Sequence, residues 1–266
     1  MRPAGALSVA AGGLKISACI ITLNEAQRIE RCLAALDFCD EIIVVDAHSS
    51  DETRAIAARC GARVIERDWP GYRSQKQFAT DAAQHEWVLS VDADEWVTPA
   101  LRAEILELKA RGLPNVAGYS VARLTRYFGG FLRHGNAWPE RKIRLYRRSA
   151  ARWSGYEVHE KIALEGPVGR LGAPLEHDAY RSLDDQLARM DRYARLMAEE
   201  LARGGRRCTL AAAFLHPAWR FVRGMFIRGG LLDGWRGWLF HCVEAGYVHR
   251  KYLRLWAAAR VRHAPP

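Results

Sequence analysis

The chain has 266 residues, of which 49% are hydrophobic and 26% are charged, and its formal net charge is +10. This composition excludes a disordered chain, a collagen and a coiled coil, and the length fits one large domain or one domain with an appendage. Segment 203–263 contains twelve Lys or Arg residues and two acids, so it holds the whole excess of positive charge. The sequence therefore describes a neutral body followed by a basic tail.

The cysteines and the hydropathy favour a cytoplasmic protein. The six cysteines are scattered and form no C-x-x-C pair, so neither a zinc site nor a disulfide framework is expected. Residues 1–14 make a poor signal peptide and are expected to form a flexible leader. No apolar run approaches the length of a transmembrane helix.

Between residues 15 and 112 short apolar runs alternate with helical patterns. Strands are expected at 16–23, 41–45, 63–66 and 86–91, and helices at 26–36, 49–59, 72–83 and 99–110. Ser49 and Glu52 fit a capping box that would open the second helix. Four successive βα units predict a mostly parallel sheet with helices on both faces, whose ligands bind at the carboxyl ends of the strands.

After residue 113 the pattern changes. Short strand-like pieces such as 116–124 and 142–147 are separated by Gly, Trp and Pro. A long helix is expected at 183–202, directly after Ser182. The basic tail follows the glycine pair at 204–205.

Polar residues end three of the predicted strands. The first strand runs into Thr22, Asn24 and Glu25, the second ends in Asp46, and the fourth is followed by Asp92 and Asp94. Residues i and i+2 of an extended chain project the same way, so the last two carboxylates can face one ion such as Mg²⁺ or Mn²⁺. The alternative for this pair is a solvated acidic turn before the helix at 99–110.

Residues 15–101 resemble the nucleotide-sugar half of the inverting GT-A glycosyltransferases of family 2. The resemblance is carried, in order, by Thr22-Leu23-Asn24-Glu25, the run from Val44 to Thr53, and Val91-Asp92-Ala93-Asp94-Glu95. Similarity to bacterial β-glucosyltransferases of the lipopolysaccharide inner core extends through Trp153-x-Gly155-x-x-Val158-His159-Glu160 to His177-x-x-Tyr180.

The resemblance implies an α/β fold of the GT-A kind, Rossmann-like, with a mostly parallel sheet and flanking helices. The expected organisation is a leader at 1–14, a nucleotide-sugar-binding half at 15–112, an acceptor-binding half at 113–181 and a helical, membrane-associating region at 182–266.

The resemblance also suggests donor-binding residues. Thr22, Asn24 and Glu25 would lie near the nucleoside, and Asp46 would contact the uracil or ribose, although it could instead cap the following helix. Lys76 occupies a position that often carries a basic residue near the nucleotide; otherwise it is a solvated helix residue. Family members commonly have Asn where this chain has Gln77.

The implied cofactor is a divalent metal, Mg²⁺ or Mn²⁺, that bridges the donor diphosphate. Asp92 and Asp94 are the expected ligands, and Asp94 corresponds to the carboxylate that family members usually employ. His177 could supply a further ligand, or it could simply be a polar residue before the next helix.

An inverting transfer requires a group that takes the proton of the acceptor hydroxyl. Glu160 lies where the family places its acidic base motif, and His159 could orient that carboxylate or act as the base itself. Glu157 and Glu140 are further candidates. The alternative for Glu160 is a surface residue paired with Lys161.

Segment 123–152 contains nine basic residues and one acid. Arg141 and Arg144, with Arg147 and Arg148 nearby, are predicted to bind an acceptor that carries phosphates, because the planar guanidinium matches a phosphate. A lipid A–Kdo–heptose core would fit. The alternative is a solvated basic face.

The tail contains two helical apolar faces with arginines between them. Their members are Leu215, Trp219, Val222 and Phe226, and then Leu231, Trp235, Trp238 and Cys242. Such faces suit an anionic membrane surface, on the cytoplasmic side of the inner membrane for this enzyme class. Alternatively, they pack on the catalytic domain.

The leading hypothesis is an inverting glycosyltransferase that moves a sugar, glucose by resemblance, from a UDP-sugar to a lipopolysaccharide inner-core heptose. A polyprenyl-phosphate glycosyltransferase is an alternative, and its acceptor needs no base. A nucleic-acid-binding protein is the alternative from another class, but the neutral body and the strand-end carboxylates argue against it.

Overall fold

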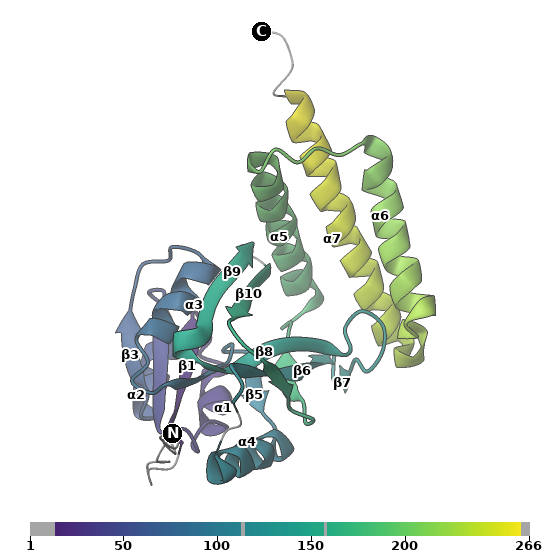
Figure 1. Ribbon diagram of the computed structural model, residues 1–266. Helices are drawn as coiled ribbons and strands as arrows, with labels where there is room; N and C mark the ends of the chain where they lie inside the picture. The colour runs from purple at the N-terminus through teal and green to yellow at the C-terminus, as the bar shows by residue number, and fades with distance from the viewer. Residues whose placement is uncertain (1–13, 113–114, 157–158, 262–266) are drawn as a thin grey trace, which may run out of the picture.

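The computed structural model describes residues 14–112, 115–156 and 159–261, with only the backbone described for His159 and Val261 (Figure 1). The predicted leader therefore lies, except for Leu14, outside the described residues. The remaining chain forms a twisted sheet with helices packed on it and a group of long helices standing beside it.

The N-terminal part of the sheet is parallel, as the alternating pattern predicts. Strands β1 (Ile16–Thr22), β2 (Glu41–Asp46), β3 (Arg63–Glu66) and β4 (Trp87–Ser90) lie in the order β3-β2-β1-β4. All three pairings between them are parallel, so their carboxyl ends lie along one edge.

Later strands extend the same sheet through both predicted halves. Beyond β4 the order is β8-β6-β12-β5, and β8 runs antiparallel to both of its neighbours. Strand β12 lies parallel to β6 and antiparallel to β5. The bounds are β5 (Glu95–Val97), β6 (Gly118–Tyr127), β7 (Gly130–Phe131), β8 (Glu140–Arg147), β11 (Val168–Arg170) and β12 (Leu175–Asp178), where β7 and β11 pair with β6.

Each face of the sheet buries its own apolar cluster. One cluster joins Ile20 of β1 to helices α1 (Ile29–Ala34) and α4 (Pro99–Arg111), and Leu101 and Ile105 of α4 are fully buried. The other joins Ile43 and Tyr146 to helix α3 (Tyr72–Asp81) and to the hairpin of β9 (Ala151–Tyr156) and β10 (His159–Leu164). Helix α2 (Thr53–Arg59) lies between β2 and β3 in the chain.

The long C-terminal helices form a second layer beside the sheet (Figure 1). Helix α5 (Leu183–Arg203) packs on α7 (Gly234–Val261) through a core that includes Met190 and Tyr247. Helix α6 (Leu210–Val222) runs beside α7, and a π-helical turn (Arg223–Ile227) and a 3-10 turn (Gly230–Asp233) connect the two. Within the described residues, none of these helices combines the length and apolarity that a membrane crossing requires.

The helices α6 and α7 are fixed to the sheet by polar as well as apolar contacts. The carboxylate of Asp233 accepts hydrogen bonds from the backbone N–H groups of Arg133 and His134, each at 3.0 Å. The buried ring of His241 accepts one from the N–H of Asn136 at 3.1 Å. A Cβ atom at Gly224 would lie 2.1 Å from that ring, so this close approach requires glycine.

The predicted apolar faces of the tail are exposed. Of their eight members, seven are more than 40% exposed, and the exposed ones are Leu215, Trp219, Val222, Phe226, Leu231, Trp235 and Trp238. The alternative that these faces pack on the catalytic domain is therefore wrong. The contacts of α7 with α5 and the sheet use other side chains, including Phe240 and Tyr247.

Candidate active site

A cleft of about 1020 Å³ lies where the carboxyl ends of β1 and β4 face α3, the β9–β10 hairpin, α5 and α7. A cleft of this size and position is typical of a ligand site in an α/β sheet. It collects most of the residues predicted from the sequence, namely Thr22, Glu25, Lys76, Asp92, Asp94, Arg141, Arg144, Glu160 and His177. Asn24 and Asp46 are not part of its described lining.

Asp92 is held between two buried cations. The Nζ atom of Lys76 lies 2.7 Å from its Oδ1 atom, and Nη2 of Arg144 lies 2.8 Å from its Oδ2 atom. Burial opposes ionisation of Asp92, but Arg144 and then Lys76 outweigh it and hold the pKa well below its ordinary value. Asp92 is therefore a partly buried, ion-paired carboxylate, not a solvated turn residue.

Asp94 has a looser set of neighbours than Asp92. Its Oδ2 atom lies 3.6 Å from Nε2 of His177 and 3.6 Å from the guanidinium groups of both Arg28 and Arg189. Burial disfavours the charged form, but His177 and Arg189 lower the pKa of Asp94 to about 2. The side chain is thus ionised at neutral pH, with its partners too far away for short hydrogen bonds.

Glu160 on β10 contacts Lys76 on α3, with 2.7 Å between Oε1 and Nζ. Lys76 is only 7% exposed and its Nζ atom lies 5.1 Å from the ring centroid of Trp153. The alternatives of a solvated Lys76 and of a Glu160–Lys161 surface pair are therefore wrong. The side chain of His159 lies outside the described residues, as does Glu157.

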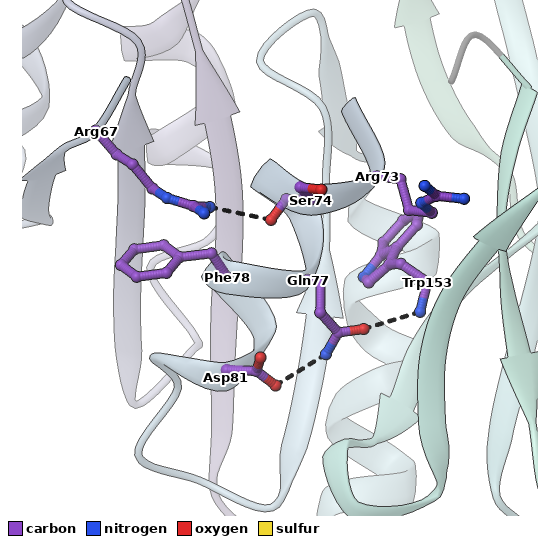
Figure 2. Close-up of a pocket in the computed structure, with 7 residues that line it drawn as sticks. All are labelled: Arg67, Arg73, Ser74, Gln77, Phe78, Asp81 and Trp153. Carbon is purple, nitrogen blue, oxygen red and sulfur yellow. Dashed lines mark hydrogen bonds between the residues drawn. The ribbon is translucent and has the colours of Figure 1, made fainter. Parts of the chain in front are cut away.

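Gln77, the neighbour of Lys76, joins α3 to the other strand of the hairpin (Figure 2). Its Oε1 atom accepts a hydrogen bond from the backbone N–H of Trp153 at 2.9 Å, and its Nε2 atom donates to Asp81 at 2.8 Å. These groups line a separate, smaller pocket of about 310 Å³. Two consecutive side chains of α3 thus position both β9 and the Glu160 strand.

Glu140 is a weak candidate for the base. Its carboxylate pairs with Arg123 and also lies 3.1 Å from Nζ of Lys142. Burial acts against ionisation, but Arg123 and Lys142 lower the pKa of Glu140 to about 2. A carboxylate this acidic has little tendency to take a proton at neutral pH.

Asp46 organises the loop that follows β2. Its buried carboxylate accepts hydrogen bonds from the backbone N–H of Ser49 at 2.7 Å and from the hydroxyl of Thr22 at 2.8 Å. The Ser49 hydroxyl also donates to Asp46 and accepts from the N–H of Asn24. The predicted capping box of Ser49 with Glu52 is therefore wrong, because this hydroxyl links β1 to β2 instead.

Asn24 and Glu25 directly follow β1, and they too contact distant segments of the chain. Asn24 adopts a left-handed φ of 56°, and its side-chain oxygen accepts from the N–H of Ser50 at 2.8 Å. Glu25 lies 3.0 Å from Nη2 of Arg181. Burial, and then the charge of Asp94, raises the pKa of Glu25 above its ordinary value.

The predicted acceptor arginines already have partners within the protein. The guanidinium of Arg144 is buried against Asp92 and Glu95, so Arg144 is not part of a solvated basic face. Arg141 donates to the backbone carbonyls of Ser120 and Leu171, at 3.2 Å each. Both side chains line the cleft, and their acceptor role remains a prediction.

No three His, Cys, Asp or Glu side chains within residues 14–112, 115–156 and 159–261 are placed to hold a metal ion by themselves. Asp94 and His177 offer an oxygen and a nitrogen ligand 3.6 Å apart. Mg²⁺ and Mn²⁺ commonly use one or two protein ligands and complete their shells with water and phosphate oxygens. The donor set therefore fits an ion that binds together with a phosphate ligand.

Comparison with known proteins defines the family. The model of glycosyl transferase family 2 matches residues 17–163, more than half of the chain. The chain is also 34% identical over 240 residues to the lipopolysaccharide core biosynthesis glycosyltransferase LpsC of Rhizobium meliloti (strain 1021), with 87% of each chain covered. The chain belongs to glycosyl transferase family 2.

The chain is similar to further proteins. The chain is 29% identical over 252 residues to an uncharacterized glycosyltransferase of Rickettsia felis, covering 91% of this chain and 88% of the relative. Among solved structures it is similar to mannosyl-3-phosphoglycerate synthase from Rubrobacter xylanophilus, with 22% identity, a TM-score of 0.46, and 74% and 76% of the two chains covered.

Membership in this family confirms the predicted enzyme class. The family 2 glycosyltransferase has the expected α/β architecture, with a parallel set of strands, flanking helices and a long C-terminal helix. It is a transferase, which is the first of the function classes considered from the sequence.

Three residues that contact the cleft carboxylates or their partners in this family 2 glycosyltransferase escaped the sequence analysis: Glu95, Arg28 and Arg189. Glu95, fully buried, accepts from Arg144 and from the N–H of Asp92, so it supports the acidic turn that it directly follows. Arg28 and Arg189 approach Asp94 from α1 and α5. Only the position of Glu95 beside the Asp92–Asp94 motif offered a signal, because the other two depend on tertiary packing.

Proposed function

We propose that this glycosyltransferase moves a sugar, glucose by resemblance, from a UDP-sugar to a heptose of a lipopolysaccharide inner core. The observation that carries the proposal is the meeting of Asp94, His177, Asp92, Lys76 and Glu160 in one cleft at the strand ends. The name of the Rhizobium relative, which places that protein in lipopolysaccharide core biosynthesis, supports the acceptor class.

The donor is proposed to bind with its diphosphate toward Asp94. Asp94 and His177 would hold Mg²⁺ or Mn²⁺, and the bound ion would offset the charge that develops on the departing diphosphate. Asp92, whose oxygens contact Lys76 and Arg144, would act on the donor side through Lys76. Thr22, Asn24, Glu25 and Asp46 are proposed to shape the nucleoside end, Asp46 by fixing the loop after β2.

The transfer is proposed to be a single displacement with inversion. Glu160 would take the proton of the acceptor hydroxyl as the new bond forms. Its Oε1 atom contacts Lys76, and the other carboxylate oxygen is proposed to meet the acceptor. His159 is proposed to orient Glu160, and Arg141 and Arg144 to lie on the acceptor side.

The enzyme is further proposed to be peripheral on the cytoplasmic face of the inner membrane. Eleven large apolar residues are exposed along α6, its connection to α7 and the start of α7: Leu210, Phe214, Leu215, Trp219, Val222, Phe226, Ile227, Leu231, Leu232, Trp235 and Trp238. We call this set the apolar ridge. Arg223 and Arg228 lie within it, and such a mixture favours the interface of an anionic bilayer.

The experiment that tests this function is a UDP-release assay across UDP-sugars, with Mg²⁺, with Mn²⁺ and with EDTA. Hydrolysis without acceptor should identify the donor, and a heptose-terminated core should stimulate UDP release. If no UDP-sugar is turned over and calorimetry detects no UDP binding in the presence of Mn²⁺, the proposed function is wrong.

A further inference from the structure

The wall of the cleft opposite the strand ends consists of α5, α6 and α7. Overall, ten Lys or Arg side chains and six Asp or Glu side chains line the cleft, so it has an excess of positive charge. On the sheet side, Lys76, Arg123 and Arg144 are neutralised by acids at short range. The excess must therefore come from elsewhere in the lining.

Lys251 of α7 is one source of this excess. Its ammonium lies 4.7 Å from the ring centroid of Tyr252 and 5.5 Å from that of Tyr247, and within the described residues no carboxylate forms an ion pair with it. The nearby acid, Glu244, is engaged by Arg220 of α6 at 2.6 Å. Burial and the neighbouring Arg220 lower the pKa of Lys251, as expected for a cation without an anionic partner.

Arg192 of α5 is the second source. Its guanidinium lies 5.6 Å from the ring centroid of Tyr193, and the described residues supply no acid within ion-pair distance. The arginines one turn to either side differ, since Arg189 approaches Asp94 and Arg195 pairs with Glu199. Arg192 lies about 5 Å along the helix axis beyond Arg189, away from the donor carboxylates.

We infer that Arg192, Arg220 and Lys251 form an anion-binding subsite on the helical wall, and that its occupant is a phosphate group of the acceptor. The half-buried ammonium of Lys251 has no carboxylate partner among the described residues, so an anion would stabilise it, and the exposed guanidinium of Arg192 lines the same cleft and can donate to that anion. Three helices contribute one cation each, and together they bear a net positive charge that Glu244 neutralises only in part.

The subsite adds an acceptor contact to the proposed function. The identity of its occupant, a phosphate group of the acceptor, rests on that proposed function. The arginines of segment 123–152 contact carboxylates or backbone carbonyls, for example Arg144 with Asp92 and Arg148 with the carbonyl of Ala83. The helical wall instead holds Arg192 and Lys251, for which the described residues supply no acid within ion-pair distance. Contact with an acceptor phosphate is thereby assigned to the C-terminal helices, in addition to Arg141 and Arg144 on the sheet side.

The test compares Lys251→Met and Arg192→Gln with Arg195→Gln, a control on the same helix as Arg192. Met keeps the apolar packing on the tyrosine rings. With a phosphorylated heptose-terminated core oligosaccharide, each subsite variant should lose about ten-fold in kcat/KM for the acceptor, while the KM for the UDP-sugar stays constant. After phosphatase treatment of the acceptor, wild type and variants should be equal.

Equal losses on the treated and untreated acceptor would overturn the subsite. A second measurement separates this outcome from failure of the proposed function, because it needs no turnover. Inorganic phosphate is titrated calorimetrically into the UDP-saturated protein. Binding that is lost in Lys251→Met and retained in Arg195→Gln supports the subsite, and equal binding in both variants contradicts it.

Discussion

The ammonium of Lys76 lies 2.7 Å from Oε1 of Glu160 and 2.7 Å from Oδ1 of Asp92. One buried cation thus joins the proposed base, on the hairpin, to the acidic turn at the end of β4. Because α3 also holds β9 through Gln77, the hairpin that carries Glu160 is fixed to the same helix by two neighbouring side chains. The donor and acceptor sides of the cleft are therefore coupled through α3.

Replacing Lys76 by Met should remove this coupling. The change leaves Glu160 without its cation and Asp92 with Arg144 alone, so we expect kcat to fall about 100-fold. Lys76→Arg should retain part of the activity, since a guanidinium can contact both carboxylates. Steady-state kinetics at saturating donor check the result. Gln77→Glu, which disturbs the same helix without touching Glu160, separates loss of the charge from misplacement of the hairpin.

Glu160→Gln is predicted to abolish transfer while leaving donor binding intact. The amide keeps the size of the side chain but cannot take a proton, and general base catalysis commonly contributes 10² to 10⁴-fold in rate. Transfer is measured by UDP release in the presence of acceptor, and binding by calorimetry with UDP. Turnover close to wild type would remove Glu160 from the mechanism and favour an acceptor that is already ionised, such as a polyprenyl phosphate.

The sequence predicted the first four strands well because short runs of apolar and β-branched residues, bounded by turn signals, alternate there with helical patterns. The residues 41–45 and 63–66 lie in observed strands, and the helix after Ser182 begins where its cap predicts. The Ser49 cap failed because a competing acceptor, Asp46, lies on the same loop and within reach of its hydroxyl. Local patterns could not reveal that competition.

The contacts of the site were less predictable than its location. Aspartates at strand ends indicated where a ligand binds, and Asp92 and Asp94 indeed line the cleft. The arginine-rich segment was expected to bind an acceptor; Arg144 lines the cleft, but its guanidinium contacts two carboxylates, Asp92 and Glu95, that the sequence did not identify as its partners. Side-chain direction on β8 depends on its antiparallel insertion between β4 and β6, which the sequence does not disclose.

Asp94→Ala and His177→Ala should each weaken metal-dependent donor binding. Both side chains contribute the proposed ligands, and loss of one ligand leaves an ion with fewer protein contacts. We expect the affinity for UDP in the presence of Mn²⁺ to fall about ten-fold or more, toward the affinity of wild type in EDTA. Calorimetry with and without Mn²⁺ measures this difference. A variant whose UDP affinity still rises with Mn²⁺ as much as that of wild type would not have lost a ligand.

The apolar ridge is predicted to drive binding to anionic vesicles. Replacing Phe226, Ile227 and Leu232 by Ser removes exposed apolar area without touching the contacts of Phe240, so the fold should persist. Co-sedimentation with vesicles of phosphatidylglycerol and phosphatidylethanolamine should then fall at least ten-fold. Leu106→Ser, at an exposed apolar residue of α4, serves as the control. Unchanged sedimentation of the triple variant would contradict the membrane proposal.

His241 should make the stability of the enzyme depend on pH. Its Nδ1 atom donates to the carbonyl of Gly237 at 2.6 Å and its Nε2 atom accepts from the N–H of Asn136, which only the neutral ring can do. Burial lowers the pKa of His241 below its ordinary value, against weaker opposing effects from the Gly237 carbonyl and Glu244.

The unfolded chain therefore binds this proton at a higher pH than the folded protein does. The contribution of His241 to stability is complete above pH of about 6.5 and is lost as the pH falls below it, by up to about 1.4 kcal/mol per pH unit. Urea unfolding at pH 7.5, 6.5 and 5.5 measures the effect. His241→Gln should be less stable than wild type at pH 7.5, but its free energy of unfolding should decline less toward pH 5.5. If the free energies of both proteins decline in parallel, the pH dependence belongs to other groups.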